Sequence, residues 1–302
     1  MATIDNINID LFDICTDSLI KIIESSIISQ REKKYRKKIL INTYNKMINY
    51  NYIDNKYYSL AHEIKSLELL MTLPNTKLVN DHNSTPGCDF RINDYYNIEC
   101  VACTSGDERK NGYNEFYGTG VFDYNKKENI ILTRILQALN EKKEFYYKHL
   151  NSSINPDQPY IFFLSLGNLS YGSFFGKYGF SLNKILFGVH HQVYIYDNVK
   201  QKFTGTTYQY RDEILNHNDS PISCRFYNEA NSFISAIIFT TATLDEQYSL
   251  ENTYIFINPF AKNKVIINKL PKLVYWKENK NGEYIPIYKG KNMNNKLKSN
   301  IF

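Results

Sequence analysis

The chain has 302 residues, of which 43% are hydrophobic, so it can form one large domain or two modest ones with a sizeable core. Its formal net charge of +5 allows a partner that carries phosphate but does not require one. The five cysteines are odd in number and none of their spacings matches a zinc site, which predicts reduced thiols in a cytosolic compartment.

The start of the chain and its hydropathy predict a cytoplasmic protein with no membrane partner. Residues 1–14 contain three aspartates and no basic residue, which does not fit the positively charged start of a signal peptide. No apolar run reaches the length of a membrane span. An effector exported by a specialised secretion system would show the same features, so the sequence leaves export open.

The first part of the chain has the apolar spacing of helices. An apolar stripe predicts one long helix over residues 16–50, with Thr16 or Asp17 as its cap. This helix carries a basic run at residues 31–38, which is typical of a solvated helix face; contact with phosphates is the alternative. We assign residues 1–58 to an N-terminal helical segment.

A second helix is expected over residues 59–73, because Pro74 ends it. At 100° per residue, Glu63 falls within the apolar stripe of this helix, whereas His62 and Lys65 point away from it. A carboxylate inside an apolar stripe is costly unless it is paired or binds a metal. Glu63 is therefore a candidate catalytic residue.

The centre of the chain alternates between strands and helices. Strands are expected over residues 76–80, 88–93 and 96–103, a helix over 127–149 and a buried strand over 160–166. Together with the preceding helix, this order predicts an α/β core with a central mixed sheet flanked by helices. We assign the core to residues 59–167.

The last part of the chain, residues 168–302, is predicted to be a β-rich extension. Further strands are expected at residues 193–196, 233–240, 254–257, 265–267 and 273–276. These strands either complete the central sheet within the same domain or form a separate unit.

Two carboxylates are expected to meet on neighbouring strands of the core. Asp89 follows a turn at Pro86-Gly87, and Glu99 lies between apolar residues of the next strand, where a carboxylate is expected to be buried and partnered. Capping of the turn is the alternative role for Asp89. Mg²⁺ prefers oxygen ligands, usually one or two carboxylates with several waters. We therefore predict a Mg²⁺ or Mn²⁺ site formed by Asp89, Glu99 and the carbonyl oxygen of Cys100.

This order of residues resembles that of the PD-(D/E)XK, or restriction-endonuclease-like, nuclease superfamily. The superfamily's lysine lies two residues after the second acid, on the same face of the strand, where this chain has Val101. Some members take an equivalent basic group from the following helix. The resemblance therefore implies Lys142 as the catalytic lysine. It also implies contacts to phosphate or water from Arg134, Gln137 and Lys143.

The chain is also similar, over roughly residues 60–265, to a group of uncharacterised bacterial proteins that share an order of short motifs. In this chain the motifs are His62-Glu63, Gly87-Cys88-Asp89-Phe90, Ile98-Glu99-Cys100-Val101-Ala102, Ala138-Leu139 followed by Lys142, Ile234-Ser235-Ala236 and Asn258-Pro259-Phe260-Ala261.

The resemblance implies a restriction-endonuclease-like core and a metal-dependent nuclease that hydrolyses phosphodiester bonds in DNA or RNA. Asp89 and Glu99 would hold Mg²⁺, Glu63 would assist, and Lys142 would orient the water or stabilise the leaving phosphate. The first alternative is a catalytically inactive module that binds nucleic acid or protein, which Val101 in the lysine's place favours. The second is a secreted effector or toxin. The oligomeric state is not apparent from the sequence.

Overall fold

The computed structural model describes residues 9–26, 28–50, 55–73, 78–79, 88–93, 95–103, 124–152, 154–166, 180–216, 220–243, 245–265 and 273–289. The predicted Pro86-Gly87 turn and the C-terminal tail lie outside the described residues. Of the strand expected at residues 265–267, only residue 265 is described, and it is not in a strand.

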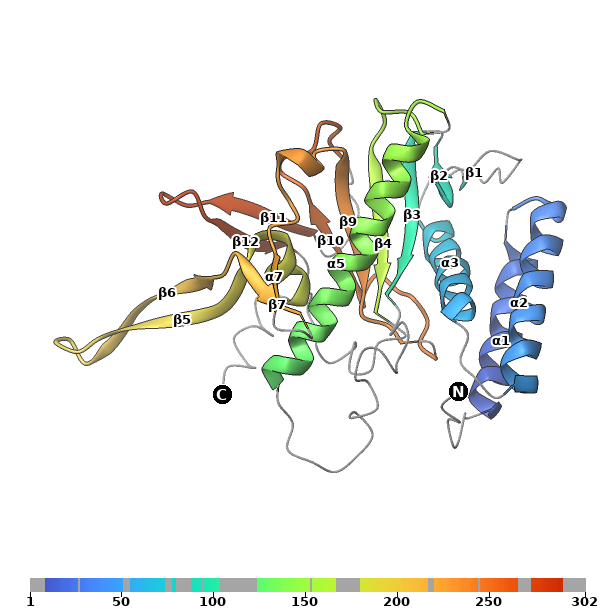
Figure 1. Cartoon of the computed structure of the whole chain (residues 1–302), viewed down its shortest axis with the longest axis horizontal. Helices are drawn as coiled ribbons and strands as arrows, with labels where there is room; N and C mark the ends of the chain where they lie inside the picture. Colours follow the sequence, from blue (N-terminus) through green and yellow to red (C-terminus); the bar gives the residue numbers. More distant parts are fainter. Residues whose placement is uncertain are drawn as a thin grey trace.

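An eight-stranded mixed sheet forms the centre of the structure (Figure 1). Its strands, in spatial order, are β1 (Leu78–Val79), β2 (Phe90–Ile92), β3 (Tyr96–Ala102), β4 (Tyr160–Ser165), β9 (Ile234–Thr240), β10 (Thr253–Ile257), β11 (Leu273–Glu278) and β12 (Tyr284–Lys289). β3, β4 and β9 run parallel to one another, whereas β1–β2, β2–β3, β9–β10 and β11–β12 are antiparallel pairs. The predicted α/β fold with a central mixed sheet flanked by helices is confirmed.

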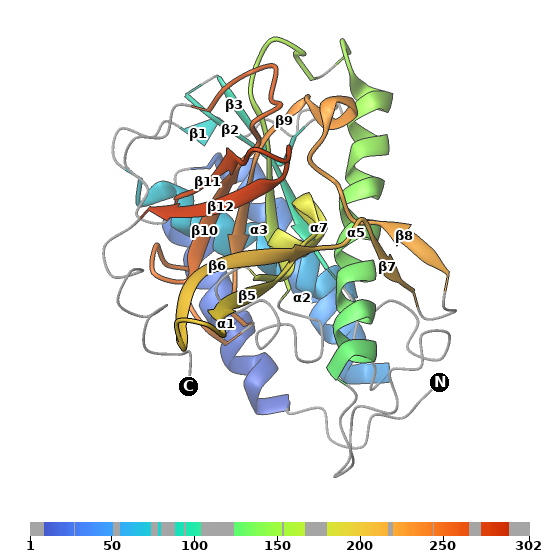
Figure 2. The ribbon, with the colours of Figure 1, turned by 90° about the vertical axis from the view of Figure 1, so that its left-hand side faces the viewer.

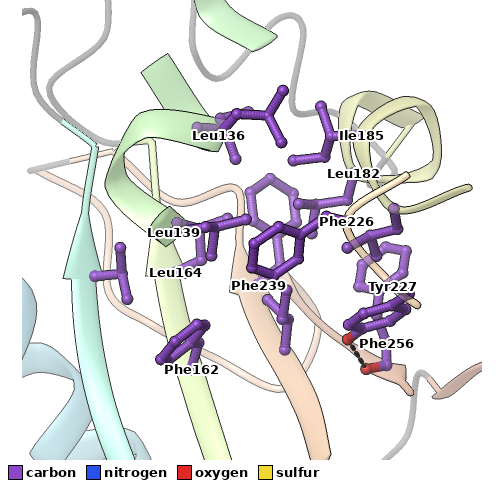
Figure 3. Packing of buried hydrophobic residues seen from close by; sticks show 14 of the residues in the cluster. Leu136, Leu139, Phe162, Leu164, Leu182, Ile185, Phe226, Tyr227, Phe239 and Phe256 are labelled. Carbon is purple, nitrogen blue, oxygen red and sulfur yellow. Dashed lines mark hydrogen bonds between the residues drawn. The ribbon is translucent and has the colours of Figure 1, made fainter. Parts of the chain in front are cut away.

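Helices α5 (Tyr124–His149) and α7 (Phe180–Phe187) cover one face of the sheet. Leu139 of α5 and Ile185 of α7 pack with Phe162, Leu164 and Phe239 of the strands in one buried cluster (Figure 3). Every residue of β4 and of β9 is buried, because the helices on both faces exclude water from the middle of the sheet.

Helix α3 (Asn55–Met71) covers the other face, where Leu67 and Leu70 join a cluster that includes Phe90 and Ile98. Outside α3 lie α1 (Ile9–Ser25) and α2 (Gln30–Tyr50), which pack against it through a third cluster (Figure 1). None of the helices in the described ranges is long and apolar enough to cross a membrane.

The prediction of a single helix over residues 16–50 is wrong, because α1 ends at Ser25 and a separate helix, α2, begins at Gln30. At the end of α1, the Ser26 hydroxyl donates to the carbonyl of Ile23 at 2.6 Å. At the start of α2, Ser29 Oγ accepts from the N–H of Glu32 at 3.2 Å, the contact of an N-cap. Thr16 and Asp17, the two predicted caps, both lie inside α1. Serine side chains that bond to the backbone thus compete with continuation of the helix.

The remaining elements lie outside the eight-stranded sheet. They are β5 (Val189–Asp197), β6 (Lys202–Tyr210), β7 (Glu213–Leu215), β8 (Pro221–Ser223) and a 3₁₀ turn at Glu229–Asn231. β5 and β6 form a hairpin that projects from the body of the molecule (Figure 1), and Figure 2 views the molecule from that side. Among the C-terminal strands, β9 to β12 complete the central sheet.

Candidate functional site

The start of β2 and the middle of β3 bring Asp89 and Glu99 side by side. Phe90 pairs with Ile98 across the antiparallel ladder, so Asp89, one residue before β2, lies opposite Glu99. The N–H of Cys100 donates a hydrogen bond of 2.7 Å to Asp89 Oδ2. This bond ties the Asp89 carboxylate to the neighbouring strand.

Glu99 is buried, with 2% of its surface exposed. Lys142 Nζ donates to Glu99 Oε1, whereas Oε2 has no hydrogen-bond partner among the residues that the structure describes. Burial, followed by the negative charge of Asp89, raises the pKa of Glu99 to about 8, and the Lys142 ammonium opposes this rise. The carboxyl group therefore keeps one desolvated, unsatisfied oxygen, which costs stability.

Lys142 reaches Glu99 from α5. Val101, two residues after Glu99, packs in the cluster beneath α5, so both side chains share this face of β3. Lys142 follows Ala138, which also contacts the cluster, by one helical turn. Burial alone would lower the pKa of Lys142, but the charges of Glu99 and Asp89 outweigh it and raise the pKa. A lysine from helix α5 thus lies beside Glu99 on the face of β3 that also carries Val101.

Glu63 lies on α3, on the opposite face of the sheet, and is paired with Arg36 of α2. Arg36 Nη1 is 2.9 Å from Glu63 Oε2, and Arg36 Nε is 2.8 Å from Glu32 Oε1. The Arg36 side chain is only 1% exposed, and its guanidinium lies 5.4 Å from the ring centre of Phe90. Burial and then the charge of Asp89 raise the pKa of Glu63 to about 7, and Arg36 opposes the rise. A carboxylate within an apolar stripe is expected to be paired, and the partner of Glu63 is Arg36.

Arg36 is a residue of the site that the sequence prediction misses. The expectation of a solvated face for the basic run is wrong at Glu32 and Arg36, which are both buried. The physical reason is that α2 turns one side toward α3, and Arg36, Leu40 and Met47 are buried at helical spacing along that side. The signal available in the sequence is that Arg36 extends the apolar stripe of Leu40 and Met47 by one turn.

His62 and Lys65, which are expected to point away from the core, are buried instead. His62 Nε2 donates to the carbonyl of Phe163 at 2.6 Å, and its Nδ1 bonds to the Tyr248 hydroxyl at 2.9 Å. Lys65 Nζ donates to the carbonyl of Glu246 at 2.8 Å. The prediction is wrong because the segment after β9 covers this side of α3, a contact that the periodicity of one helix does not reveal.

We expect buried His62 to make the fold sensitive to acid. Burial lowers its pKa from 6.5 to about 4, so between these values the unfolded chain binds a proton that the folded chain does not, and stability decreases as the pH falls. In urea unfolding, the stability advantage of the wild type over His62→Gln should shrink by about 2 kcal/mol between pH 7 and pH 5. The other titrating groups are common to both proteins. An advantage that is constant over this range would contradict the prediction.

Arg134 and Gln137 lie away from the carboxylates. Arg134 Nη1 donates to Gln137 Oε1 at 2.9 Å near the surface, and its charge acts on Cys103, beyond the end of β3. Arg134 precedes Lys142 by eight residues, which is about 12 Å along a helix. Lys143 follows Lys142 directly and is turned by about 100° around α5. A contact from these three side chains to a substrate stays a prediction.

Asp89 and Glu99 fit the requirements of Mg²⁺. The part of the chain that the structure describes contains no group of three or more His, Cys, Asp and Glu side chains arranged to hold a metal. Mg²⁺, however, needs only one or two carboxylates, because waters and substrate phosphate complete its octahedron. The unpartnered Oε2 of Glu99 beside Asp89 provides such a pair. Cys100 contacts Asp89 through its backbone N–H, and its side chain packs in the cluster beneath α3. A metal contact from the carbonyl oxygen of Cys100 stays a prediction.

The charged side chains around this pair carry an excess of negative charge. We call them the carboxylate cluster, which consists of Glu32, Arg36, Glu63, Asp89, Glu99 and Lys142. Four carboxylates face two basic groups, so the formal charge is −2 when all of them are ionised. Burial and this excess raise the pKa values of Glu63 and Glu99. A divalent cation would supply the missing positive charge.

No protein-family model, no curated protein and no solved structure matches the chain, so a functional assignment rests on the geometry and charge of the carboxylate cluster.

Proposed function

We propose that the chain is a metal-dependent nuclease that hydrolyses phosphodiester bonds in DNA or RNA with Mg²⁺ or Mn²⁺. The observation that carries this proposal is the unpartnered Oε2 of Glu99, buried in an apolar strand beside Asp89 and Lys142. A desolvated carboxylate oxygen costs stability, and a second carboxylate beside it adds to the cost. Fold stability gives no reason to keep such a group, whereas binding of a divalent cation does.

In this proposal Asp89 and Glu99 would hold the cation, which would supply an activated water and positive charge at the phosphate. Lys142 orients the water or stabilises the leaving phosphate, and its raised pKa keeps it protonated. Arg36 donates a hydrogen bond to Oε2 of Glu63, so Glu63 would assist the hydrolysis through its other oxygen. Nucleic acid is the partner because a phosphodiester supplies further oxygen ligands, and a chain of net charge +5 attracts a polyanion.

A catalytically inactive module is the second candidate. It is favoured by Val101 in the lysine's place and by the ion pair of Lys142 with Glu99, which already neutralises part of the carboxylate's charge. In this case the chain would keep its fold and bind nucleic acid or protein without catalysing a reaction.

Glu99→Gln is expected to abolish both metal binding and cleavage, because glutamine keeps the shape of the side chain but removes its charge. In isothermal titration calorimetry the wild type should bind Mn²⁺, and the variant should give no binding heat at millimolar metal. The parallel assay measures nicking of plasmid DNA and cleavage of RNA. Glu144→Gln is the matched control, since Glu144 is an exposed carboxylate on α5, and it should retain both properties.

Three outcomes separate the candidates. Binding and cleavage that are lost together in Glu99→Gln would support the nuclease. Metal binding that persists in Glu99→Gln would place the cation elsewhere and contradict the proposed site. A wild type that binds no Mn²⁺ at millimolar concentration would contradict the nuclease and leave the binding module.

We also propose that the protein acts in the cytoplasm. All five cysteines are free thiols, and four of them are buried, which agrees with a reducing compartment. Fractionation of cells that produce the chain is the test, and its appearance in the medium would favour an exported effector or toxin instead.

A further inference from the structure

A second buried oxygen without a partner lies near Glu99. The hydroxyl of Tyr160, at the start of β4, has no hydrogen-bond partner among the described residues, although the side chain is only 1% exposed. In the parallel β3–β4 ladder, Asn97 is in register with Tyr160 and Glu99 with Phe162. Tyr160 is therefore diagonally adjacent to Glu99 on the neighbouring strand.

Tyr160 and Glu99 point to the same face of the sheet. Tyr160 packs with Phe162 and Val101 in the cluster beneath α5, and strand side chains alternate with a period of two, so Glu99 shares this face. Helix α5 covers both residues. Lys142 contacts Glu99, and Tyr146, one turn further along, lies with its ring centre 4.9 Å from that of Tyr160.

The charges of the site reach the Tyr160 hydroxyl. Burial is the largest cause that raises the pKa of this hydroxyl. The electrostatic effects of Glu99, Cys88 and Asp89, in that order, raise it further. The phenol is therefore neutral at pH 7, and its oxygen lies within the electrostatic reach of the two carboxylates proposed to bind the cation.

Packing alone does not explain this hydroxyl. A phenylalanine would fill the same space without burying an unsatisfied polar atom, and β4 uses phenylalanine two residues later on the same face, at Phe162. Buried polar groups normally have partners, so an unpartnered hydroxyl beside an unpartnered carboxylate oxygen indicates a ligand that serves both. A water molecule bound to a cation has this property, because its oxygen binds the metal that the carboxylate also binds, while its hydrogens donate to neighbouring oxygens such as a hydroxyl.

We propose that Tyr160 is a positioning residue whose hydroxyl oxygen accepts a hydrogen bond from a water molecule that the cation at Asp89 and Glu99 would hold. This inference rests on the proposed metal site, and it adds a residue that the sequence analysis does not select. Tyr160 neither coordinates the metal nor transfers a proton. It fixes the orientation of the water and satisfies its own buried hydroxyl.

The test compares wild type, Tyr160→Phe and the matched control Tyr146→Phe, each titrated with Mn²⁺. Tyr146 is a buried tyrosine of the same cluster and has no role in the proposal. Mn²⁺ should produce a tyrosine ultraviolet difference spectrum in the wild type and in Tyr146→Phe, and this spectrum should be absent in Tyr160→Phe. The dissociation constant for Mn²⁺ should rise about tenfold in Tyr160→Phe only.

Two further measurements separate a positioning role from a structural one. Without metal, Tyr160→Phe should unfold at the same urea concentration as the wild type or at a higher one, because the variant loses an unsatisfied polar atom. In the cleavage assay, kcat should fall about tenfold while KM is unchanged.

The possible failures are distinguishable. If the wild type binds Mn²⁺, Glu99→Gln does not, and Tyr160→Phe behaves as the wild type does, the role of Tyr160 is overturned and the metal site stands. If metal-free Tyr160→Phe is destabilised and its Mn²⁺ affinity is normal, the hydroxyl has a structural partner and the inference is wrong. If the wild type binds no Mn²⁺, the proposed function and this inference both fall.

Discussion

Arg36→Met is expected to destabilise the fold by about 3–5 kcal/mol, the usual cost of removing one partner from a buried ion pair. Arg36 is almost fully buried and is the basic partner of both Glu32 and Glu63. Without it, Glu32, whose side chain is 9% exposed, and Glu63, whose side chain is 25% exposed, would lose this ion-pair partner. Lys142 would be the cluster's remaining basic group. Urea unfolding followed by circular dichroism and by the fluorescence of Trp276, the single tryptophan of the chain, measures the loss.

The control for this experiment is Lys37→Met. Lys37 is the next residue on α2 and pairs with Glu24, but both side chains of that pair are largely exposed. Its loss should change stability by no more than about 0.5 kcal/mol. Adding Glu63→Gln to Arg36→Met should recover part of the stability, because one unpaired carboxylate is removed. Equal effects of Arg36→Met and Lys37→Met would show that the buried pair does not hold α2 to α3.

The part of the site that can be predicted from the sequence is the part set by local patterns. Glu99 stands out because its neighbours in the strand are apolar, and the structure buries it in β3. Lys142 can be placed because helical periodicity puts it one turn from Ala138 on the face that packs on the sheet. Strand alternation and helix rotation are properties of a few neighbouring residues, and a sequence shows them directly.

The contacts of Arg36 and Tyr160 depend on residues far apart in the chain. Arg36 meets Glu63 only because α1 and α2 separate at the serines after Ile23 and α2 then packs on α3. Tyr160 meets Glu99 only because β4 lies next to β3 in a parallel register. A one-residue shift of that register would turn Tyr160 to the other face. Tertiary packing decides such contacts, and periodicity does not encode them.

The same reasoning applies to the fold. The order of helices and strands in the centre follows from apolar periodicity, but strand order does not, so the addition of β9 to β4 in the central sheet is seen only in the structure. The sequence analysis misses β6 (Lys202–Tyr210), although threonine and tyrosine favour strands, because this strand lies outside the core and nearly all of it is exposed. It therefore lacks the alternation of buried and solvated residues that identifies a strand.

Lys142→Gln is expected to change metal binding and cleavage in opposite directions. The ammonium ion competes with a cation for Glu99, so its removal should lower the dissociation constant for Mn²⁺ several-fold. Loss of Lys142 also favours protonation of Glu99, whose pKa it holds down. A divalent cation carries twice the charge of a proton and gains more from the change, so tighter metal binding should prevail. Cleavage should fall about 10²- to 10³-fold, because the charge that develops on the phosphate loses its basic partner.

This opposition separates the two candidate functions. In the nuclease, Lys142 exists for the transition state and weakens the ground-state metal complex, so calorimetry and the cleavage assay must diverge in Lys142→Gln. In an inactive module, Lys142 exists to neutralise Glu99, and its loss would lower stability without any effect on turnover. Lys148→Gln, which removes an exposed lysine from the last turn of α5, should leave metal affinity and cleavage unchanged. Parallel losses of metal binding and cleavage in Lys142→Gln would mean that Lys142 only holds Glu99 in place, and the catalytic role assigned to it would be wrong.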